Sequence, residues 1–514
     1  MAEVKSNTPQ RVEITPGVLH LYGNTILLSA LRDKHHEFVQ EYPDCEIVYT
    51  GFTNNELNVI IDRLEHILLG RMTDFGNLTI KVSYMPGITG PMHLFSMYTA
   101  SSDIGWHKIS KKDVDCGLFH HIDELNDGTK LLYVEDAHFW TTQNSSTKYR
   151  KDILLIKDGQ AQNSVIAPYD TNGTLLTCRY CTTDESEKWI KNLTLVRPYN
   201  PGSNNVCKLV KAQYQNNVLF ENITIGFDQY PSSDTIGGDA CFQIENSTNI
   251  SFKNVTINGT YSTLSDFGYG IELNNVWNSR FENLEAFGHW GVFGNNNISY
   301  AYLKNCHINR LDLHLYGKDI ICESCIFEKY QNSPDTSTHR YNRFDGLYGI
   351  LLYKNCTFND FCPVRIDYEY KVFTGFDCII QGGTINIGPH VKCLVSILRI
   401  TNADLSPRIE TTGVSWPNII MMGVTLNKSP QVSGLCPYSL FEIPNPSSYT
   451  YSGDIDYITM ITIKPITIGN NIYIKEFHTD VNAIYPINRN IDNALTVISG
   501  GQTPSAGSYV VRII

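Results

Sequence analysis

The sequence predicts a mainly β protein built around a right-handed parallel β-helix, with a separate mixed α/β domain before it and a β-rich cap after it. Three observations lead to this prediction: a short motif that returns along the middle of the chain, strand-like alternation inside each copy, and an asparagine at the same place in most copies. A repeat of this size with strand alternation is typical of a solenoid.

The motif is six residues long, with apolar residues at its first, fourth and sixth positions and usually asparagine at its third. Clear copies begin at positions 220, 252, 281, 303 and 353, and weaker ones at 190, 322, 380 and 421. The third position advances from 192 in steps of 30, 32, 29, 22, 19 and 31 residues. Apolar residues at positions four and six predict a short strand. Asparagine tolerates the left-handed backbone of a tight corner, so we expect an asparagine ladder there.

The composition limits the protein's class and its partners. A chain of 514 residues, 42% hydrophobic and 18% charged, is globular and long enough for two or three domains. The formal net charge of −12 argues against nucleic acid as a partner and offers no attraction to an anionic membrane. The N-terminus lacks an apolar signal core, and no stretch is long and apolar enough to span a bilayer. We therefore expect synthesis in the cytoplasm, with the 14 cysteines as free thiols.

Three regions follow from where the repeat begins and ends. Residues 1–150 show no repeat and contain one convincing amphipathic helix, expected at 56–69. The β-helix is expected over 151–430, with its first strand at 151–159. Residues 431–514 are expected to form a C-terminal cap or oligomerisation domain, because a solenoid must cover its open end.

Two Cys-x-x-Cys pairs raise the question of a zinc site, namely Cys178 with Cys181 and Cys322 with Cys325. The repeat explains the second pair differently, since Cys306, Cys325 and Cys356 all occupy the inward fourth position of successive copies. They are expected to stack as small buried apolar residues. No second ligand pair with zinc spacing accompanies Cys178 and Cys181. The sequence thus predicts no metal and no cofactor.

A second strand precedes each asparagine corner by about ten residues and carries the candidate functional groups. Leu311, Leu313 and Leu315 alternate with Asp312 and His314, which are therefore expected to point outward. The same alternation turns outward Gln243 and Glu272 in earlier coils, and Arg365, Asp367 and Glu369 in a later coil. Outward polar residues on a solenoid are usually a solvated face, and the last three are also explained as an exposed ion-pair network.

The spacing of two carboxylates favours a catalytic role. Glu272 and Asp312 are expected two coils apart, roughly 9.5 Å, at the upper edge of the spacing in inverting glycosidases. The coil between them contains His289 and Trp290 in a glycine-rich segment. Because glycine has no side chain, this segment is expected to leave space on the outer surface for a ligand. A carboxylate and an imidazole on one strand can act as base and acid. The candidate catalytic residues are Asp312, Glu272, His314 and His289, and the candidate substrate-binding residues are Trp290, Arg310, Arg365, Asp367 and Glu369.

The central part of the chain resembles a known family. Gly288 to Asn295, then Lys304-Asn305-Cys306, then Arg310-Leu311-Asp312-Leu313-His314 are similar to the β-helix domain of phage pre-neck appendage proteins and related tailspikes. The family shows W-G-hydrophobic-x-G-x-N, then K-N-C, then R-F-D-A-H, and the resemblance covers about 190–385. The sequence departs from it at Leu311 and Leu313, and at Gly270, where the family often carries an acidic residue.

The resemblance implies a homotrimer on a phage tail, made in the host cytoplasm, which binds and often cleaves a bacterial surface glycan such as a polysaccharide or teichoic acid. It would contact other virion tail proteins through its N-terminal domain. Two alternatives stay open at this point. One is a receptor-binding or structural tail protein of the same fold without chemistry, and the other is a pectate-lyase-like enzyme that modifies polysaccharides.

Overall fold

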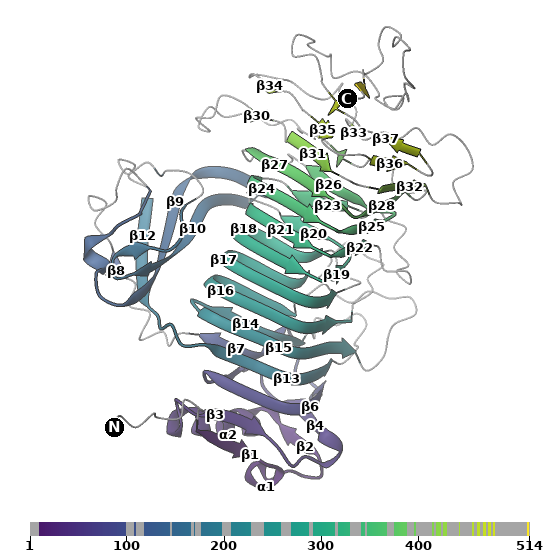
Figure 1. Ribbon diagram of the computed structural model, residues 1–514. Coiled ribbons are helices and arrows are strands. Elements are labelled where there is room, and N and C mark those ends of the chain that lie inside the picture. The colour runs from purple at the N-terminus through teal and green to yellow at the C-terminus, as the bar shows by residue number, and fades with distance from the viewer. Residues whose placement is uncertain are drawn as a thin grey trace, which may run out of the picture.

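The computed structural model describes residues 10–98, 107–108, 118–143, 146–165, 169, 176–197, 207–227, 241–258, 269–286, 291–313, 317–328, 341–344, 347–366 and 375–387, and short strands from there to 512. Parallel strands stack along one axis, with the N-terminal segment at one end (Figure 1). Among these residues no helix is long and apolar enough to cross a membrane. The protein is a parallel β-helix, as the sequence predicts.

The solenoid begins near the N-terminus. Its first strands are β1 (Arg11–Ile14), β2 (Thr25–Leu27), β3 (Glu46–Tyr49), β4 (Glu56–Ile61), β5 (Ile67–Leu68), β6 (Met72–Tyr84) and β7 (Met92–Tyr98). Between them lie the helices α1 (Pro16–Leu19) and α2 (Leu28–Glu41) and the short helix η1 (Thr53–Asn55). Strands β1, β3 and β6 pair in parallel, and β6 then pairs in parallel with β13 (Lys188–Arg197). A separate N-terminal domain is therefore not confirmed.

The central coils continue this ladder without a break in pairing. Their strands are β14 (Cys207–Gln213), β15 (Asn216–Phe227), β16 (Phe242–Ile257), β17 (Tyr269–Ala286), β18 (Gly291–Lys304), β19 (His307–Ile308), β20 (Leu311–Leu313), β21 (Gly317–Glu323), β22 (Ile326–Glu328), β23 (Tyr341–Phe344), β24 (Leu347–Lys354), β25 (Thr357–Asn359), β26 (Cys362–Ile366), β27 (Gly375–Gln381) and β28 (Thr384–Ile387). All pair in parallel with the equivalent strand of the next coil.

The asparagine ladder is present. Asn222 donates from Nδ2 to Oδ1 of Asn192 at 2.9 Å, Asn254 donates in the same way to Asn222 at 2.9 Å, and Asn283 to Asn254 at 2.8 Å. Each of these asparagines has a positive φ between 53° and 59°. The side chain thus bonds the corner above to the corner below, while the backbone turns where other residues would be strained. The predicted superposition of these positions is confirmed.

The interior is filled by stacks of like side chains. The rings of Phe220, Phe252 and Phe281 follow one another with centroids 4.9 Å apart, close to the rise between neighbouring strands. Higher up, the predicted cysteine stack is confirmed, since Cys306, Cys325 and Cys356 are all at most 2% exposed. Their Sγ atoms lie within 3.3–3.6 Å of backbone carbonyl oxygens.

A column of alternating charge runs up the outside, one residue before the asparagine column. The strand registers align Asp74, Lys191, Glu221, Lys253, Glu282, Lys304, Glu323 and Lys354 in successive coils. Lys253 lies 2.9 Å from Glu221, and Lys354 lies 3.2 Å from Glu323. Each charge in this charge column therefore has opposite charges as its neighbours.

A second sheet is inserted between β7 and β13. It is antiparallel and contains β8 (His107–Lys108), β9 (Thr129–Gln143), β10 (Ser146–Lys157), β11 (Gln160–Ala161) and β12 (Leu176–Thr182), with a short helix η4 (Asp123–Leu125). Figure 1 shows β9 and β10 arching beside the central coils. One face packs on the solenoid through Leu131, Ile153, Leu155 and Cys181, against Tyr214 and Trp277. We call these five strands the inserted sheet.

Beyond β28 the described strands are short. The parallel ladder continues through β29 (Val395–Ser396), β31 (Asn418–Met422), β32 (Thr425–Lys428), β33 (Phe441–Glu442), β35 (Met460–Thr462) and β36 (Ile466–Ile468). Antiparallel strands follow at β37 (Asn471–Tyr473), β38 (Glu476–Phe477) and β39 (Val511–Arg512). A further parallel pair joins β30 (Val414–Ser415) and β34 (Ile455–Asp456). Most of 431–514 lies outside the described residues, so the C-terminal cap stays a prediction.

Two local predictions are wrong. The helix expected at 56–69 is strand β4 followed by a turn and β5, because Leu57, Val59 and Ile61 alternate inward at 0% exposure and pair with β6. The strand expected to open the solenoid at 151–159 belongs to β10, which pairs antiparallel with β9 in the inserted sheet. In both cases pairing with a neighbouring strand decides what local periodicity leaves open.

Candidate functional site

The outward strand predicted to carry function forms one face of the solenoid. It consists of the outward residues of β7, β14, β16, β17, β18, β20, β23 and β26, which we call the polar face. The registers align one column of this face as Ser96, Lys211, Gln243, Glu272, Gly294, Asp312, Arg343 and Arg365. Residues from eight strands, far apart in the sequence, thus lie in one line along the axis.

Glu272 and Asp312 lie two coils apart in this column, with Gly294 between them. The pairing of β17 with β18 has a constant offset through Ile271 and Phe293, and Gly294 pairs directly with Asp312. Two steps of the parallel rise correspond to about 9.5 Å. Since glycine has no side chain, Gly294 itself places no atoms beyond its backbone between the two positions.

Asp312 is not the exposed carboxylate that the alternation predicts. Its neighbours Leu311 and Leu313 do point into the core, but Asp312 itself is 0% exposed. Its Oδ2 lies 3.0 Å from Nη2 of Arg310, which is also 0% exposed, and the guanidinium of Arg310 lies 4.7 Å from the ring centre of Tyr341. A buried charge requires an opposite partner, and the pair supplies it. Arg310 therefore neutralises Asp312 and is not exposed to hold a substrate anion.

A polar network lies beneath this pair, inside the coil. The backbone N–H of Leu311 donates to Oδ1 of Asn342 at 2.8 Å, and Nδ2 of Asn342 donates to the hydroxyl of Tyr353 at 2.9 Å. Tyr353 in turn donates to the carbonyl oxygen of Pro363 at 2.8 Å. Burial raises the pKa of the Tyr353 hydroxyl well above its usual value, so it stays a donor. This network fixes β20, β23, β24 and β26 to one another.

The described lower half of the polar face is organised around Glu245 in β16. Its carboxylate accepts hydrogen bonds from the side-chain amides of Gln213 and of Gln243, the latter at 2.8 Å. Lys211 lies 3.8 Å away. All four side chains are half-buried. Their polar groups are held in fixed positions at the surface, which is the arrangement that recognition of a polar ligand needs. Sequence analysis placed Gln243 here but missed the central role of Glu245.

Two bulges change which residues of β7 and β14 face outward. The N–H groups of Leu209 and Val210 both donate to the carbonyl oxygen of Cys241, at 2.8 and 3.1 Å, and both side chains are buried. Leu94 and Phe95 are likewise both buried in β7. Lys208 and Lys211, three positions apart, therefore both lie on the polar face, and His93 is the register partner of Lys208. Bulges of this kind re-aim side chains and are frequent beside functional sites.

The inserted sheet borders the polar face. Tyr214, whose backbone N–H donates to the carbonyl oxygen of Glu245 at 3.1 Å, ends the polar-face strand and packs against the sheet. On the sheet, Tyr133 donates to Glu135 at 2.5 Å and Lys151 lies 2.9 Å from Glu135. Arg179 is exposed and is the register partner of Tyr133.

Several predicted site residues lie outside the described residues. These are His289, Trp290, His314, Asp367 and Glu369. Arg365 is in β26 at the upper end of the column, where its backbone position alone is described. Among the described residues no cluster of histidine, cysteine and acidic residues is arranged to hold a metal. Cys178 and Cys181 belong to two different apolar clusters on opposite sides of β12, so they do not face one ion together.

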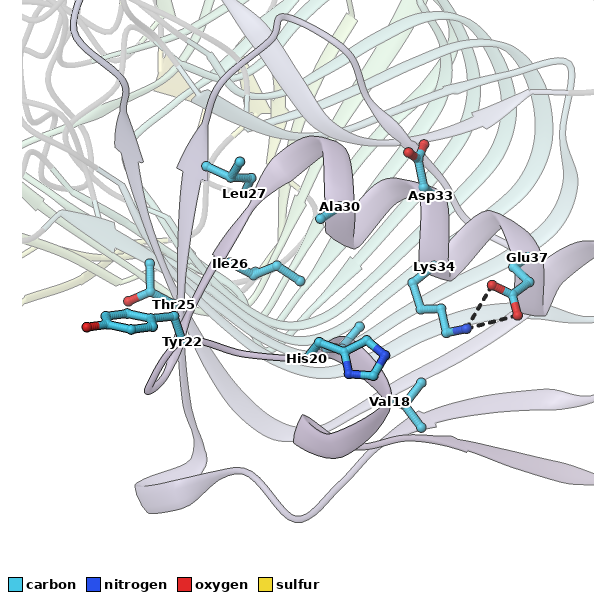
Figure 2. A pocket seen from close by; sticks show the side chains of 11 residues that line it. Val18, His20, Tyr22, Thr25, Ile26, Leu27, Ala30, Asp33, Lys34 and Glu37 are labelled. Carbon is cyan, nitrogen blue, oxygen red and sulfur yellow. Dashed lines mark hydrogen bonds and ion pairs between the residues drawn. The ribbon is translucent and has the colours of Figure 1, made fainter.

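A cavity of about 500 Å³ lies at the N-terminal end, away from the polar face. Figure 2 shows that it lies between α1, the turn at Tyr22 and Thr25, and one face of α2. Its walls are mostly apolar, including Val18, Ile26 and Leu27, and Lys34 closes one side through its ion pair with Glu37 at 2.8 Å. None of the predicted site residues lines it.

Comparison with solved structures finds several similar chains. The tailspike protein gp49 of Pseudomonas phage LKA1 matches with a TM-score of 0.53 over 89% of this chain and 76% of its own, at 10% sequence identity. The gp54 tailspike of Acinetobacter baumannii bacteriophage AP22, solved with a capsular saccharide, matches with a TM-score of 0.47 over 87% and 69%, at 11% identity. PfbA, a surface adhesin of Streptococcus pneumoniae, matches with a TM-score of 0.41 over 91% and 93%, at 10% identity. At 10% identity the match to gp49 shows a shared fold alone.

No model of a protein family matches the sequence, and no curated protein is recognisably related to it.

Proposed function

We propose that this chain is a bacteriophage tail protein that binds a bacterial surface glycopolymer along the polar face. The observation that carries the proposal is the aligned row of half-buried polar side chains at Lys211, Gln243 and Glu272, presented by successive strands of a parallel ladder. The fold shared with the tailspike gp49 and the motif resemblance in the centre of the chain support it.

The geometry suits an extended polymer better than a small molecule. The polar side chains repeat along the axis at the strand spacing of about 4.8 Å, so successive units of a linear ligand would meet successive coils. Amide and carboxylate groups, as at Gln213, Gln243 and Glu245, donate to and accept from sugar hydroxyls. Because hydrogen bonds already fix these side chains, binding loses little of their conformational freedom.

Binding is tested with the purified chain and envelope glycans from candidate host strains, measured by biolayer interferometry. Replacing Glu245 with alanine should weaken binding about 10- to 100-fold, since it removes one acceptor and releases Gln213 and Gln243. Glu282→Ala is the matched control, because Glu282 is exposed in the charge column and outside the polar face. Equal affinity of the two variants for the same glycan would place the binding site elsewhere.

Hydrolysis of the bound polymer is a second candidate function, favoured by the two-coil separation of Glu272 from Asp312. A separation near 9.5 Å leaves room for a water molecule, as inverting hydrolases require. Under this proposal Glu272, which is half-buried and belongs to the polar face, is a better candidate than the buried Asp312 for the general acid or base. Incubation with host glycan should release oligosaccharides, and Glu272→Gln should stop the release while leaving binding intact. Binding without any product would leave the receptor-binding function alone.

We also propose that the chain attaches to other virion proteins through its N-terminal end and acts as a homotrimer. Tyr22, 93% exposed beside the cavity of Figure 2, offers a side chain for such a contact. Light scattering coupled to size exclusion tests the trimer, because a monomer of 58.1 kDa would contradict it. Copy number on purified particles tests the attachment.

A further inference from the structure

Helix α2 covers one side of strand β5 at the N-terminal end of the solenoid (Figure 1). On its other side β5 pairs with β7, where the backbone N–H of Leu69 donates to the carbonyl oxygen of Ser96 at 3.0 Å. Successive backbone N–H groups of a strand point to opposite sides, so the N–H of Leu68 points away from β7. It donates to Nε2 of His36 at 2.7 Å. The imidazole therefore takes the place of the carbonyl oxygen that a further parallel strand would supply.

A second histidine fixes the same helix to the core. His35 is 0% exposed, and its Nδ1 atom lies 2.9 Å from the hydroxyl oxygen of Tyr49 in β3. Its Nε2 atom is buried and has no hydrogen-bond partner among the described residues. The ring of Tyr49 stacks on Phe75 with centroids 4.8 Å apart, so the imidazole of His35 packs beside an aromatic cluster. Such a site holds a neutral imidazole and has no group to compensate a charged one.

The surroundings of both histidines disfavour a positive charge. Burial, followed by the nearby His36, lowers the pKa of His35 to about 3. Burial, followed by the charge of Arg32, also lowers the pKa of His36, and the opposite effect of Asp33 is smaller. Both imidazoles are therefore neutral at pH 7, the state in which a ring nitrogen can accept a hydrogen bond.

The other titratable groups around α2 do not change this. Strands β2 and β5 and helix α1 carry none, and Glu56 of β4 pairs with Lys81 at 2.7 Å. The turn between β4 and β5 supplies Glu65, which pairs with Arg32, together with Asp62, Arg63 and His66. Asp62 accepts from the backbone N–H and the hydroxyl of Ser29 at 3.0 and 2.6 Å, which fixes the first turn of α2. Because a carboxyl group ordinarily titrates at about pH 4, mild acid acts on the histidines first.

We propose that α2 is an acid-sensitive cap, which detaches from β3 and β5 when His35 and His36 take up protons and so uncovers the outer edge of β5, while the central coils stay folded. A protonated His36 has no lone pair left to accept the N–H of Leu68, and a protonated His35 carries a charge in an apolar site. An uncovered strand edge can pair with a strand of another chain. This response to acid does not depend on glycan binding.

Hydrogen-exchange mass spectrometry of the full chain tests the cap at pH 7.5 and pH 5.0, with labelling times scaled to the intrinsic exchange rate at each pH. A histidine whose pKa falls on folding contributes its full stability above the unfolded pKa of 6.5 and loses it as the pH drops toward 3. For His35 alone this raises the opening constant of α2 about 30-fold at pH 5. Protonation of His36 should add to that factor. Peptides from 28–41 should show the increase, and peptides from 269–286 should not.

Glutamine variants separate the two histidines from the general effect of acid. His36→Gln keeps an oxygen that can accept the N–H of Leu68 but does not titrate, so its acid response should be smaller than that of the wild-type chain. His35→Gln should lose the 30-fold part assigned to His35, and the double variant should lose the whole response. The matched control is His20→Gln, because His20 is exposed at the end of α1. It should respond to acid as the wild-type chain does.

Three results would overturn the proposal. One is equal protection of α2 at pH 7.5 and pH 5.0 in the wild-type chain. Another is equal acceleration in α2 and in 269–286, since that describes unfolding of the whole solenoid. The third is a double glutamine variant that responds to acid as strongly as the wild-type chain. If that variant already lacks protection of α2 at pH 7.5, His36→Gln decides: a reduced response supports the cap, and an unchanged response contradicts it.

Discussion

Replacing Asp312 with asparagine should destabilise the solenoid around β20, in addition to any effect on chemistry. Asp312 and Arg310 are both 0% exposed and their charged atoms are 3.0 Å apart. The substitution removes the carboxylate charge 3.0 Å from a buried guanidinium, a change that typically costs about 3–5 kcal/mol. An exposed ion pair would lose no more than about 1 kcal/mol. The magnitude therefore separates the buried arrangement from an exposed one.

Hydrogen-exchange mass spectrometry measures this locally. In peptides that cover 307–313 and 341–344, a loss of 3 kcal/mol or more should accelerate exchange by a factor of at least about 100, since each 1.4 kcal/mol is tenfold. The double variant Arg310→Met and Asp312→Leu should recover most of the protection, because well-packed apolar side chains replace a buried pair without net loss. Unchanged exchange in Asp312→Asn, or a double variant as labile as the single one, would refute the argument.

This outcome has a bearing on how activity data are interpreted. Loss of glycan cleavage in Asp312→Asn would not by itself identify a catalytic group, because the variant also disturbs the strand that carries it. Glu272→Gln avoids this difficulty, since Glu272 is half-buried and lies on β17, not on the strand of the buried pair. The two variants together separate a structural from a chemical contribution.

Three further predictions concern stability. Burial lowers the pKa of His35 from 6.5 to about 3. Between these two pH values the unfolded chain binds a proton that the folded chain does not. The free energy of unfolding is therefore at its full value above pH 6.5 and falls as the pH drops toward 3. At pH 5 the loss is about 2 kcal/mol, visible as faster hydrogen exchange in α2 and absent in His35→Gln. Asn254→Ala should cost about 2–3 kcal/mol, because it breaks two ladder hydrogen bonds at a φ of 53°, and Asn254→Asp, which keeps an acceptor but no donor, should lie in between. Phe252→Ala should cost about 3–5 kcal/mol in urea unfolding, whereas Phe252→Leu should cost clearly less; equal losses would contradict the stacked packing.

The central coils were predictable because one physical constraint repeats. Each coil must turn at a left-handed corner and then bury alternate side chains, so Asn222, Asn254 and Asn283 mark the fold in the sequence itself. Near the N-terminus the corners are built differently, with left-handed residues at Asn54, Asn55 and Gly76 outside the motif. The first coils therefore lack the signature, although their strands pair in the same ladder.

The site was predictable in its alignment but not in its burial. Alternation correctly places Asp312 opposite Leu311 and Leu313, and the registers set it two coils from Glu272. Alternation says only that a side chain leaves the core, and a second layer can still cover it. The Arg-x-Asp spacing of Arg310 and Asp312 was the available signal, because residues two apart on a strand share a face. The inserted sheet and the bulge at Leu209 depend on contacts that no local pattern encodes.

The charge column limits how a protein of this kind can change length. Removing a single coil, for example the one that carries Glu221, would bring Lys191 directly beside Lys253, while removing two consecutive coils would again set a lysine against a glutamate. Like charges on adjacent strands repel, so growth and shortening are favoured in pairs of coils. A change by an even number of coils keeps lysine and glutamate alternating in the charge column. A designed protein with a longer binding face should therefore gain two coils at a time.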